Sequence, residues 1–199
     1  MTRFIEEAIA RGGMGPVLAS RRAGDMAAVR ASQASWSKAD LLVLGAVADA
    51  VRAEDVGDVV QVHERVREGE GGGVTWVDVP PGTSELDVLR AVAVARISAG
   101  AKARIGIDWS RYGLELAQVA LGFGASDLTG AITRKSGLPI LDDEKKKLKG
   151  QGMVDLKSIK KKEIAALVTY AGREPVFVEA QPSDSASRIA SRPETTTHA

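Results

Sequence analysis

The best candidate for a ligand site in this sequence is a glycine-flanked acidic segment, Gly-Ala-Ser-Asp-Leu-Thr-Gly, at residues 124–130. Glycines permit a tight turn and a close approach of the backbone to a bound molecule. In an array of parallel βα units such turns lie at the carboxyl ends of the strands, where ligands bind. Gly124, Ser126 and Asp127 are therefore candidate binding residues. The alternative is that the glycines serve only the turn and that Asp127 bonds to the local backbone.

A second candidate set lies at the end of the apolar segment 103–109. Asp108, Trp109 and Arg111 could line a pocket, with an indole for stacking and a pair of opposite charges. The alternative is that Trp109 and Tyr112 only fill the open side of a sheet. The sequence favours this second interpretation.

Other charged residues offer weaker signals. His63 could take part in acid–base catalysis, but no partner is visible in the sequence, so a structural or solvated role is favoured. Arg90 and Arg96 flank an alanine-rich helical segment, where salt bridges are favoured over phosphate binding. Arg173 and Glu174 are adjacent, and we expect a local ion pair between them.

The composition excludes several kinds of chemistry. The chain has 199 residues and no cysteine, so it has no disulfide, no thiolate nucleophile and no conventional iron–sulfur cluster. Its two histidines are His63 and His198, too few for a conventional zinc site. We therefore expect no metal site and no cofactor.

The overall charge is nearly balanced, at +1 from 27 basic and 26 acidic side chains. This balance gives no general attraction to nucleic acid or to an anionic membrane. No apolar run reaches the roughly 18 residues of a membrane span, and the first residues do not resemble a secretory signal. We expect a cytoplasmic protein that binds neither nucleic acid nor membrane.

Residues 134–162 form the one strongly basic region. Its lysines concentrate at residues 145–149 and 160–162, without the aromatic side chains that usually stack on single-stranded nucleic acid. A solvated loop, or a contact to an acidic protein partner, is the favoured interpretation.

The elements that would position these residues alternate between strand and helix. The spacing predicts a helix over 38–54, with Ser37 and Asp40 as a capping box, and a second helix over 84–100 that begins at Ser84 and buries Leu86 with other apolar residues. Strands are predicted at 59–66, 74–79 and 103–109, and a helix follows over 112–124. Such alternation predicts a parallel sheet of βα units.

The chain divides into three parts by composition. Residues 1–35 form a helical N-terminal segment, residues 36–180 an α/β domain, and residues 181–199 a small, polar tail that we expect to be disordered. A short helix at 163–172 and a strand at 175–179 close the α/β domain.

Four segments, in order, resemble the radical S-adenosylmethionine enzymes of the futalosine route to menaquinone, of the aminofutalosine synthase and dehypoxanthine futalosine cyclase type. The segments are ADLLVLGAVADAVRAEDVGDVV, GGGVTWVDVPPG with LDVLRAVAVARI, YGLELAQVALGFGASDLTGAI, and EIAALVTYAGREPVFVE. The resemblance covers residues 35–68 and 71–180. It implies a partial parallel (βα) sheet derived from a TIM-like barrel, and a pocket near Asp127 that would take the adenosine part of a nucleoside.

The chain departs from this family between its first two strands. The family's cysteine loop and central βα units are missing, since Glu70 is followed directly by Gly71. The family's acidic pair after the glycine-rich segment is replaced by Thr133-Arg134-Lys135. The resemblance therefore implies common descent and part of the fold, without the cluster, S-adenosylmethionine or the radical chemistry.

Three functions are compatible with these observations. The first is a non-catalytic pseudoenzyme that acts as a partner or regulatory subunit, docked on a full-length enzyme of the family. The second is a small-molecule binder that keeps part of a nucleoside-like pocket, and the third is one half of a split enzyme. A sheet of three or four strands would leave Val77, Val79, Ile105 and Ile107 poorly shielded, so we also expect a protein partner or a homo-oligomer.

Overall fold

The computed structural model describes residues 3–64, 73–133 and 159–178. The expected disordered tail at 181–199 and most of the basic region 134–162 lie outside these ranges.

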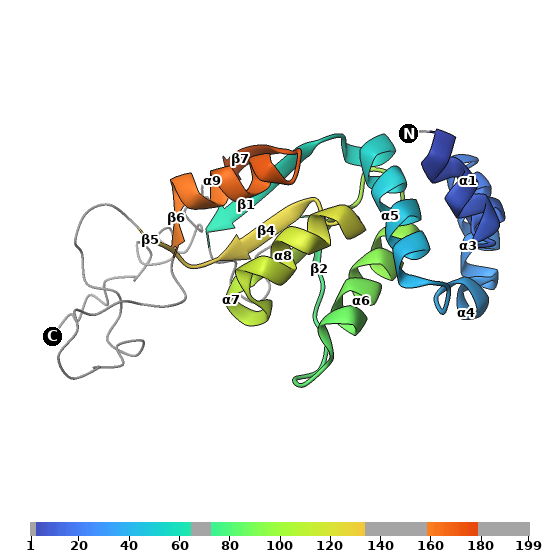
Figure 1. Cartoon of the computed structure of the whole chain (residues 1–199), viewed down its shortest axis with the longest axis horizontal. Helices are drawn as coiled ribbons and strands as arrows, with labels where there is room; N and C mark the ends of the chain where they lie inside the picture. The colour runs from blue at the N-terminus through green and yellow to red at the C-terminus, as the bar shows by residue number, and fades with distance from the viewer. Residues whose placement is uncertain (1–2, 65–72, 134–158, 179–199) are drawn as a thin grey trace, which may run out of the picture.

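Four short helices build the N-terminal segment. They are α1 (Arg3–Arg11), α2 (Gly15–Arg22), α3 (Met26–Ala31) and α4 (Gln33–Trp36). Asp25 caps α3 by accepting a hydrogen bond from the amide of Ala28 at 2.9 Å. The indole of Trp36 donates to the Val29 carbonyl at 2.8 Å, which ties α4 to α3. These helices gather at one end of the molecule beside α5 (Figure 1) and share a hydrophobic cluster with it.

Asp40 is the N-terminal cap of helix α5 (Leu41–Val56), and the predicted capping box at Ser37 is wrong. The Asp40 carboxylate accepts hydrogen bonds from the amides of Leu42 at 3.0 Å and Val43 at 3.2 Å. Asp40 therefore satisfies the free amides of the first turn by itself. The helix ends at Gly57, as predicted, where φ is +69°.

The strands and helices alternate as the sequence predicts. In chain order they are β1 (Val59–Glu64), β2 (Val74–Trp76), α6 (Glu85–Ser98), β3 (Arg104–Asp108), α7 (Trp109–Tyr112), α8 (Leu114–Ala120), the 3₁₀ helix η1 (Leu121–Phe123), β4 (Asp127–Gly130), β5 (Ile132–Thr133), β6 (Ile159–Lys160), α9 (Lys161–Tyr170) and β7 (Glu174–Val178). Ser84 caps α6 by accepting from the Asp87 amide at 3.2 Å, in agreement with the sequence.

Among the described residues, the main sheet has five parallel strands in the order β2-β3-β4-β1-β7. The chain is therefore a mixed α/β protein with more strands than the three or four expected. The first strand lies inside the sheet, between β4 and the last strand, β7. Strands β5 and β6 form a separate parallel pair.

One face of the sheet carries the main hydrophobic core. Val60, Val62, Ile105, Ile107 and Leu128 point to this face and pack against α6, α8 and α9. Figure 1 shows α8 and α9 over the same side of the sheet. Ile105 and Ile107 are fully buried, so the expectation that they lie on a poorly shielded face is wrong. The prediction that Leu86 is buried is also wrong, because this residue is 63% exposed at the start of α6.

The opposite face is polar, because side chains alternate between the two faces of a strand. We call it the polar face. Its central residues, read from the strand register, are Gln61, His63, Trp76, Arg104, Gly106, Asp127 and Thr129. Within the described ranges, neither hydrophobic cluster includes any of them. The polar face is therefore where chemistry-bearing side chains collect.

Candidate functional site on the polar face of the sheet

Residues 124–130 do not form the predicted turn. Gly124 ends η1 with φ at +96°, and Asp127 then opens β4, in the middle of the sheet. Asp127 is level with Gln61 on one neighbouring strand and Gly106 on the other. The prediction failed because a strand flanked by glycines has the same composition as a turn. The carboxylate therefore lies at mid-sheet height, not at the carboxyl ends of the strands.

Asp127 is the centre of a hydrogen-bonded network. Its side chain is fully buried, and its Oδ1 lies 2.8 Å from Nε2 of His63. Its Oδ2 accepts from Nε of Arg104 at 2.8 Å and from the Ser126 hydroxyl at 2.7 Å. Burying an unpaired carboxylate would cost several kcal/mol, on the order of 3–5 when a partner is removed. The three contacts compensate the buried charge.

The strand register explains why these residues meet. Arg104 lies two residues before Gly106 on β3, and His63 lies two residues after Gln61 on β1. Since Gly106 and Gln61 are both level with Asp127, Arg104 approaches from the amino side of the sheet and His63 from the carboxyl side. The network thus joins three adjacent strands. The partner of His63 that is not visible in the sequence is therefore Asp127, on the neighbouring strand.

Trp76 covers the network from the edge strand. A Cβ atom on Gly106 would lie 2.2 Å from Cζ3 of Trp76, so the indole lies directly on this glycine. The Trp76 and His63 rings meet edge to face, with centroids 5.4 Å apart and planes at 87°. Two contacts, one from Trp76 and one from Asp127, therefore hold the orientation of the imidazole.

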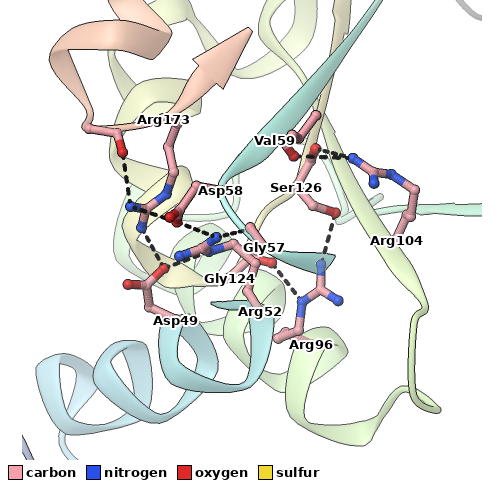
Figure 2. Close-up of polar contacts among 11 residues, drawn as sticks. Asp49, Arg52, Gly57, Asp58, Val59, Arg96, Arg104, Gly124, Ser126 and Arg173 are labelled. Carbon is pink, nitrogen blue, oxygen red and sulfur yellow. Dashed lines mark hydrogen bonds and ion pairs between the residues drawn. The ribbon is translucent and has the colours of Figure 1, made fainter. Parts of the chain in front are cut away.

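Ser126 is held from the other side by a buried arginine. Arg96 is fully buried and donates from Nη2 to the Ser126 hydroxyl at 2.9 Å and from Nε to the Gly124 carbonyl at 2.8 Å (Figure 2). A third bond reaches the Ala103 carbonyl. These contacts replace the predicted salt bridge. Burial lowers the pKa of the Arg96 guanidinium to about 10, because the charged form loses hydration.

Glycine is required at position 124 for two reasons. Its φ of +96° lies in a region that other residues rarely adopt, and a Cβ there would lie 2.9 Å from Cβ and Cγ of Arg96. Arg96 holds both Gly124 and Ser126 at the start of β4, and the Ser126 hydroxyl contacts Asp127. Of the first predicted set, all three residues come together.

The second predicted set lies elsewhere, at the carboxyl end of β3. Asp108 caps α7 by accepting from the Ser110 amide at 2.7 Å. Trp109 is 5% exposed and belongs to the main hydrophobic core, against Gly130. Arg111 forms an ion pair with Asp78 and donates to the Val79 carbonyl.

Each residue of this second set has a contact that organises the polypeptide itself. The Tyr112 hydroxyl adds a further one by accepting from the Val79 amide at 2.9 Å. Together Arg111 and Tyr112 hold the segment after β2, which leaves the strand at Trp76 although the sequence predicts a strand to residue 79.

A second polar network, at the start of β1, joins the first and last parts of the α/β domain. Arg173 donates to Asp49 at 2.7 Å and lies 3.6 Å from Asp58 (Figure 2). Arg52 donates to the same two carboxylates, at 2.8 Å and 3.2 Å. The predicted local pair between Arg173 and Glu174 is therefore wrong. Arg173 instead fixes the start of β7 to helix α5.

Arg90 also departs from its predicted role. It donates to the carbonyls of Ser37 at 2.9 Å and Ala39 at 2.8 Å, and so links α6 to the start of α5. Both carbonyls belong to the main chain, as do the two carbonyls that accept hydrogen bonds from Arg96. The arginines of α6 therefore hold loops in place rather than pairing with carboxylates.

Sequence reasoning missed His63, Arg104 and Trp76 as parts of one site. The signal was present in the alternation of the strands. In β1, Val60 and Val62 alternate with Gln61 and His63, and in β3, Ile105 and Ile107 alternate with Arg104. The polar members of parallel strands share a face. The strand order, which the sequence does not give, was needed to bring them together.

The arrangement suits proton transfer and the binding of a polar ligand. A carboxylate paired with an imidazole is the arrangement by which enzymes orient a histidine base. In the ranges 3–64, 73–133 and 159–178, no group of three or more His, Asp or Glu side chains could hold a metal ion. In the same part of the chain, no helix has the length and apolar character needed to cross a membrane.

Comparison with known proteins adds no assignment. No protein-family model matches the chain, and no curated protein sequence matches it.

Proposed function

We propose that this protein binds a small, nucleoside-like ligand on the polar face of its sheet, over the His63–Asp127 pair. The observation that supports it is the convergence of Asp127, His63 and Arg104 on one face, with Trp76 beside them. Nucleoside ligands present hydroxyl groups and ring nitrogens for hydrogen bonding and an aromatic ring for stacking. A polar cluster next to an indole offers both kinds of contact.

We further propose that the chain is a truncated relative of the futalosine-pathway radical enzymes. In a (βα) barrel the last strand closes on the first, the helices cover the outside, and the opposite face lines the interior. Here β2, β3 and β4 pair in chain order and β4 then pairs with β1, in the place of the closing strand, while α6, α8 and α9 all pack on one face. The polar face would then correspond to the barrel interior, and β7 would take the place next to β1 that the missing second unit leaves.

Thermal unfolding with added nucleosides tests this function. At ten times Kd a ligand stabilises the folded state by about 1.4 kcal/mol, which raises Tm by about 3–6 °C for a chain of this size. We expect futalosine or adenosine to give such a shift in the native protein and in a His198→Gln control. The His63→Gln variant should give a much smaller shift. No shift with any purine nucleoside at millimolar concentration would contradict the proposal.

A second candidate is a partner or regulatory subunit of a full-length enzyme of that family. The observation that favours it is the open sheet, because β2 and β7 each pair with a single strand of the main sheet in the described ranges. Edge strands of this kind offer unpaired amides and carbonyls to another chain. Val176, on the edge strand β7, is 41% exposed.

This second candidate has a separate test. A tagged copy of the chain would be mixed with a purified cysteine-bearing enzyme of the family, and the mass of the complex measured by light scattering. A stoichiometric complex, or activity that requires both chains, would support a subunit or a split enzyme. A monomer or homo-oligomer that does not bind the enzyme would exclude both the subunit and the split-enzyme role.

A further inference from the structure

We propose that His63 is a general base on the polar face and that Asp127 is the residue that positions it. The proposal rests on which atoms of the network carry hydrogens. Arg104 has only donors, and its Nε donates to Oδ2 of Asp127 at 2.8 Å. An ionised carboxylate bound in this way has only acceptor oxygens. Oδ1 must therefore accept from the remaining partner, Nε2 of His63, at 2.8 Å.

This contact fixes the tautomer of the imidazole. When Nε2 carries the hydrogen, Nδ1 of neutral His63 carries the lone pair. Within the described ranges, the side chain of His63 makes one hydrogen bond, the one from Nε2. Its side chain is 16% exposed, whereas Asp127 is fully buried. The lone pair on Nδ1 is thus the part of the network that remains for a ligand.

The ring is also held in position, which a base requires. Asp127 fixes one edge of the ring through its hydrogen bond, and Trp76 packs on it at 87°. Ser126 and Arg96 in turn hold Asp127, since the Ser126 hydroxyl donates to Oδ2 and accepts from Arg96. Support of this kind limits the rotation of a catalytic group and lowers the reorganisation that proton transfer needs.

The chemistry follows from the lone pair on Nδ1. Nδ1 takes a proton from an O–H or N–H group of a polar ligand, or from a water molecule that attacks the ligand. The imidazolium that forms is stabilised by the Asp127 carboxylate, which keeps its charge throughout. The proton returns to the product or to solvent, so no oxidant, reductant or cofactor is consumed. The substrate class is a small molecule with a hydroxyl or lactam N–H group, or a hydrolysable bond.

This inference goes beyond ligand binding and can be tested without any nucleoside. The first experiment is a long-range ¹H–¹⁵N correlation spectrum of the whole chain labelled with ¹⁵N-histidine. The chain has two histidines, so His198 serves as the internal comparison. We expect His63 to be locked with hydrogen on Nε2, and the signals of His198 are identified by their absence from the spectrum of His198→Gln. A mixture at His63, or hydrogen mainly on Nδ1, would overturn the proposal.

The Asp127→Asn variant distinguishes positioning from a purely structural role. The asparagine amide would donate to Nε2, so His63 should change to the tautomer with hydrogen on Nδ1. An unchanged tautomer in the folded variant would show that Asp127 does not position the ring. If this variant does not fold, the spectrum of the native chain still decides the assignment.

The second experiment measures the base directly, with 4-nitrophenyl acetate as the probe. His63 would take a proton from water, the hydroxide would attack the ester carbonyl, and 4-nitrophenolate would leave with the bonding electrons. General bases contribute about 10²–10⁴-fold with their own substrates, so we expect about a tenfold loss with this unspecific probe in His63→Gln. Glutamine keeps a donor toward Asp127. Equal rates in His63→Gln and the His198→Gln control would overturn the general-base role.

Discussion

Replacing Asp127 tests the energetics of the network most sharply. In Asp127→Ala, Arg104, His63 and Ser126 all lose their shared acceptor, and a cavity remains where the carboxylate was. Removing one partner of a buried ion pair costs about 3–5 kcal/mol. Arg104 is 20% exposed and can recover some hydration, so we expect the lower part of that range, about 3 kcal/mol.

Such a loss is a large fraction of the total stability, which is about 5–15 kcal/mol for a domain. Urea denaturation followed by circular dichroism measures it. With a slope of about 2 kcal/mol per molar urea, the midpoint should fall by about 1.5 M. Asp127→Asn should lose about half as much, because the amide keeps the shape and most of the hydrogen bonds.

A surface aspartate provides the control for this series. Asp78 pairs with Arg111, and its side chain is 72% exposed. Exposed ion pairs contribute about 0–1 kcal/mol, so Asp78→Ala should lower the midpoint only slightly. Equal effects of Asp127→Ala and Asp78→Ala would refute the buried network.

Three further substitutions test contacts around the site. Gly106→Ala places a methyl group against Trp76, so the unfolding free energy should fall by about 1–3 kcal/mol and the tryptophan fluorescence should change; an unaltered spectrum would contradict the contact. Gly124→Ala adds a clash with Arg96 and about 1–3 kcal/mol of backbone strain. Differential scanning calorimetry should therefore show a Tm that is at least several degrees lower. Arg173→Ala should cost about 2–4 kcal/mol and speed hydrogen exchange in β7, whereas Arg22→Ala, which breaks an exposed pair with Glu54, should cost less than about 1 kcal/mol; similar exchange of β7 in both would argue against the role of Arg173.

Much of the fold follows from local patterns. The apolar spacing and the glycine at position 57 predicted α5 to within a few residues, and Ser84 with Asp87 predicted the start of α6. The alternation of strands and helices predicted a parallel sheet. These predictions succeed because they depend on residues close in sequence, where capping and periodicity act directly.

The site could be predicted only in part, because its contacts join residues far apart in sequence. The glycine-rich surroundings of Ser126 and Asp127 indicate a candidate binding site, but the same glycines also predict a turn, where the structure has a strand. His63 and Asp127 are 64 residues apart and meet only because β1 pairs with β4. No local pattern in this sequence fixes that pairing, so the polar face became visible only with the strand order.

Long arginine side chains were the least predictable feature. Arg96 and Arg90 were assigned to salt bridges, but they donate to main-chain carbonyls and a serine hydroxyl. Arg173 was assigned to its neighbour but binds Asp49, 124 residues away. A guanidinium offers five donors on a flexible stem. Its partner is therefore set by tertiary packing rather than by sequence proximity.

Binding of a nucleoside at the polar face is the central claim, and the indole signals of the three tryptophans test it most directly. Trp76 lies beside His63 in the proposed site, whereas Trp36 lies among the N-terminal helices. A ¹H–¹⁵N spectrum of the ¹⁵N-labelled chain would be recorded during a titration with futalosine or adenosine. The account predicts a saturable shift of the Trp76 indole signal with Trp36 unchanged. Saturable binding that leaves Trp76 unchanged, or no binding at all, would contradict it.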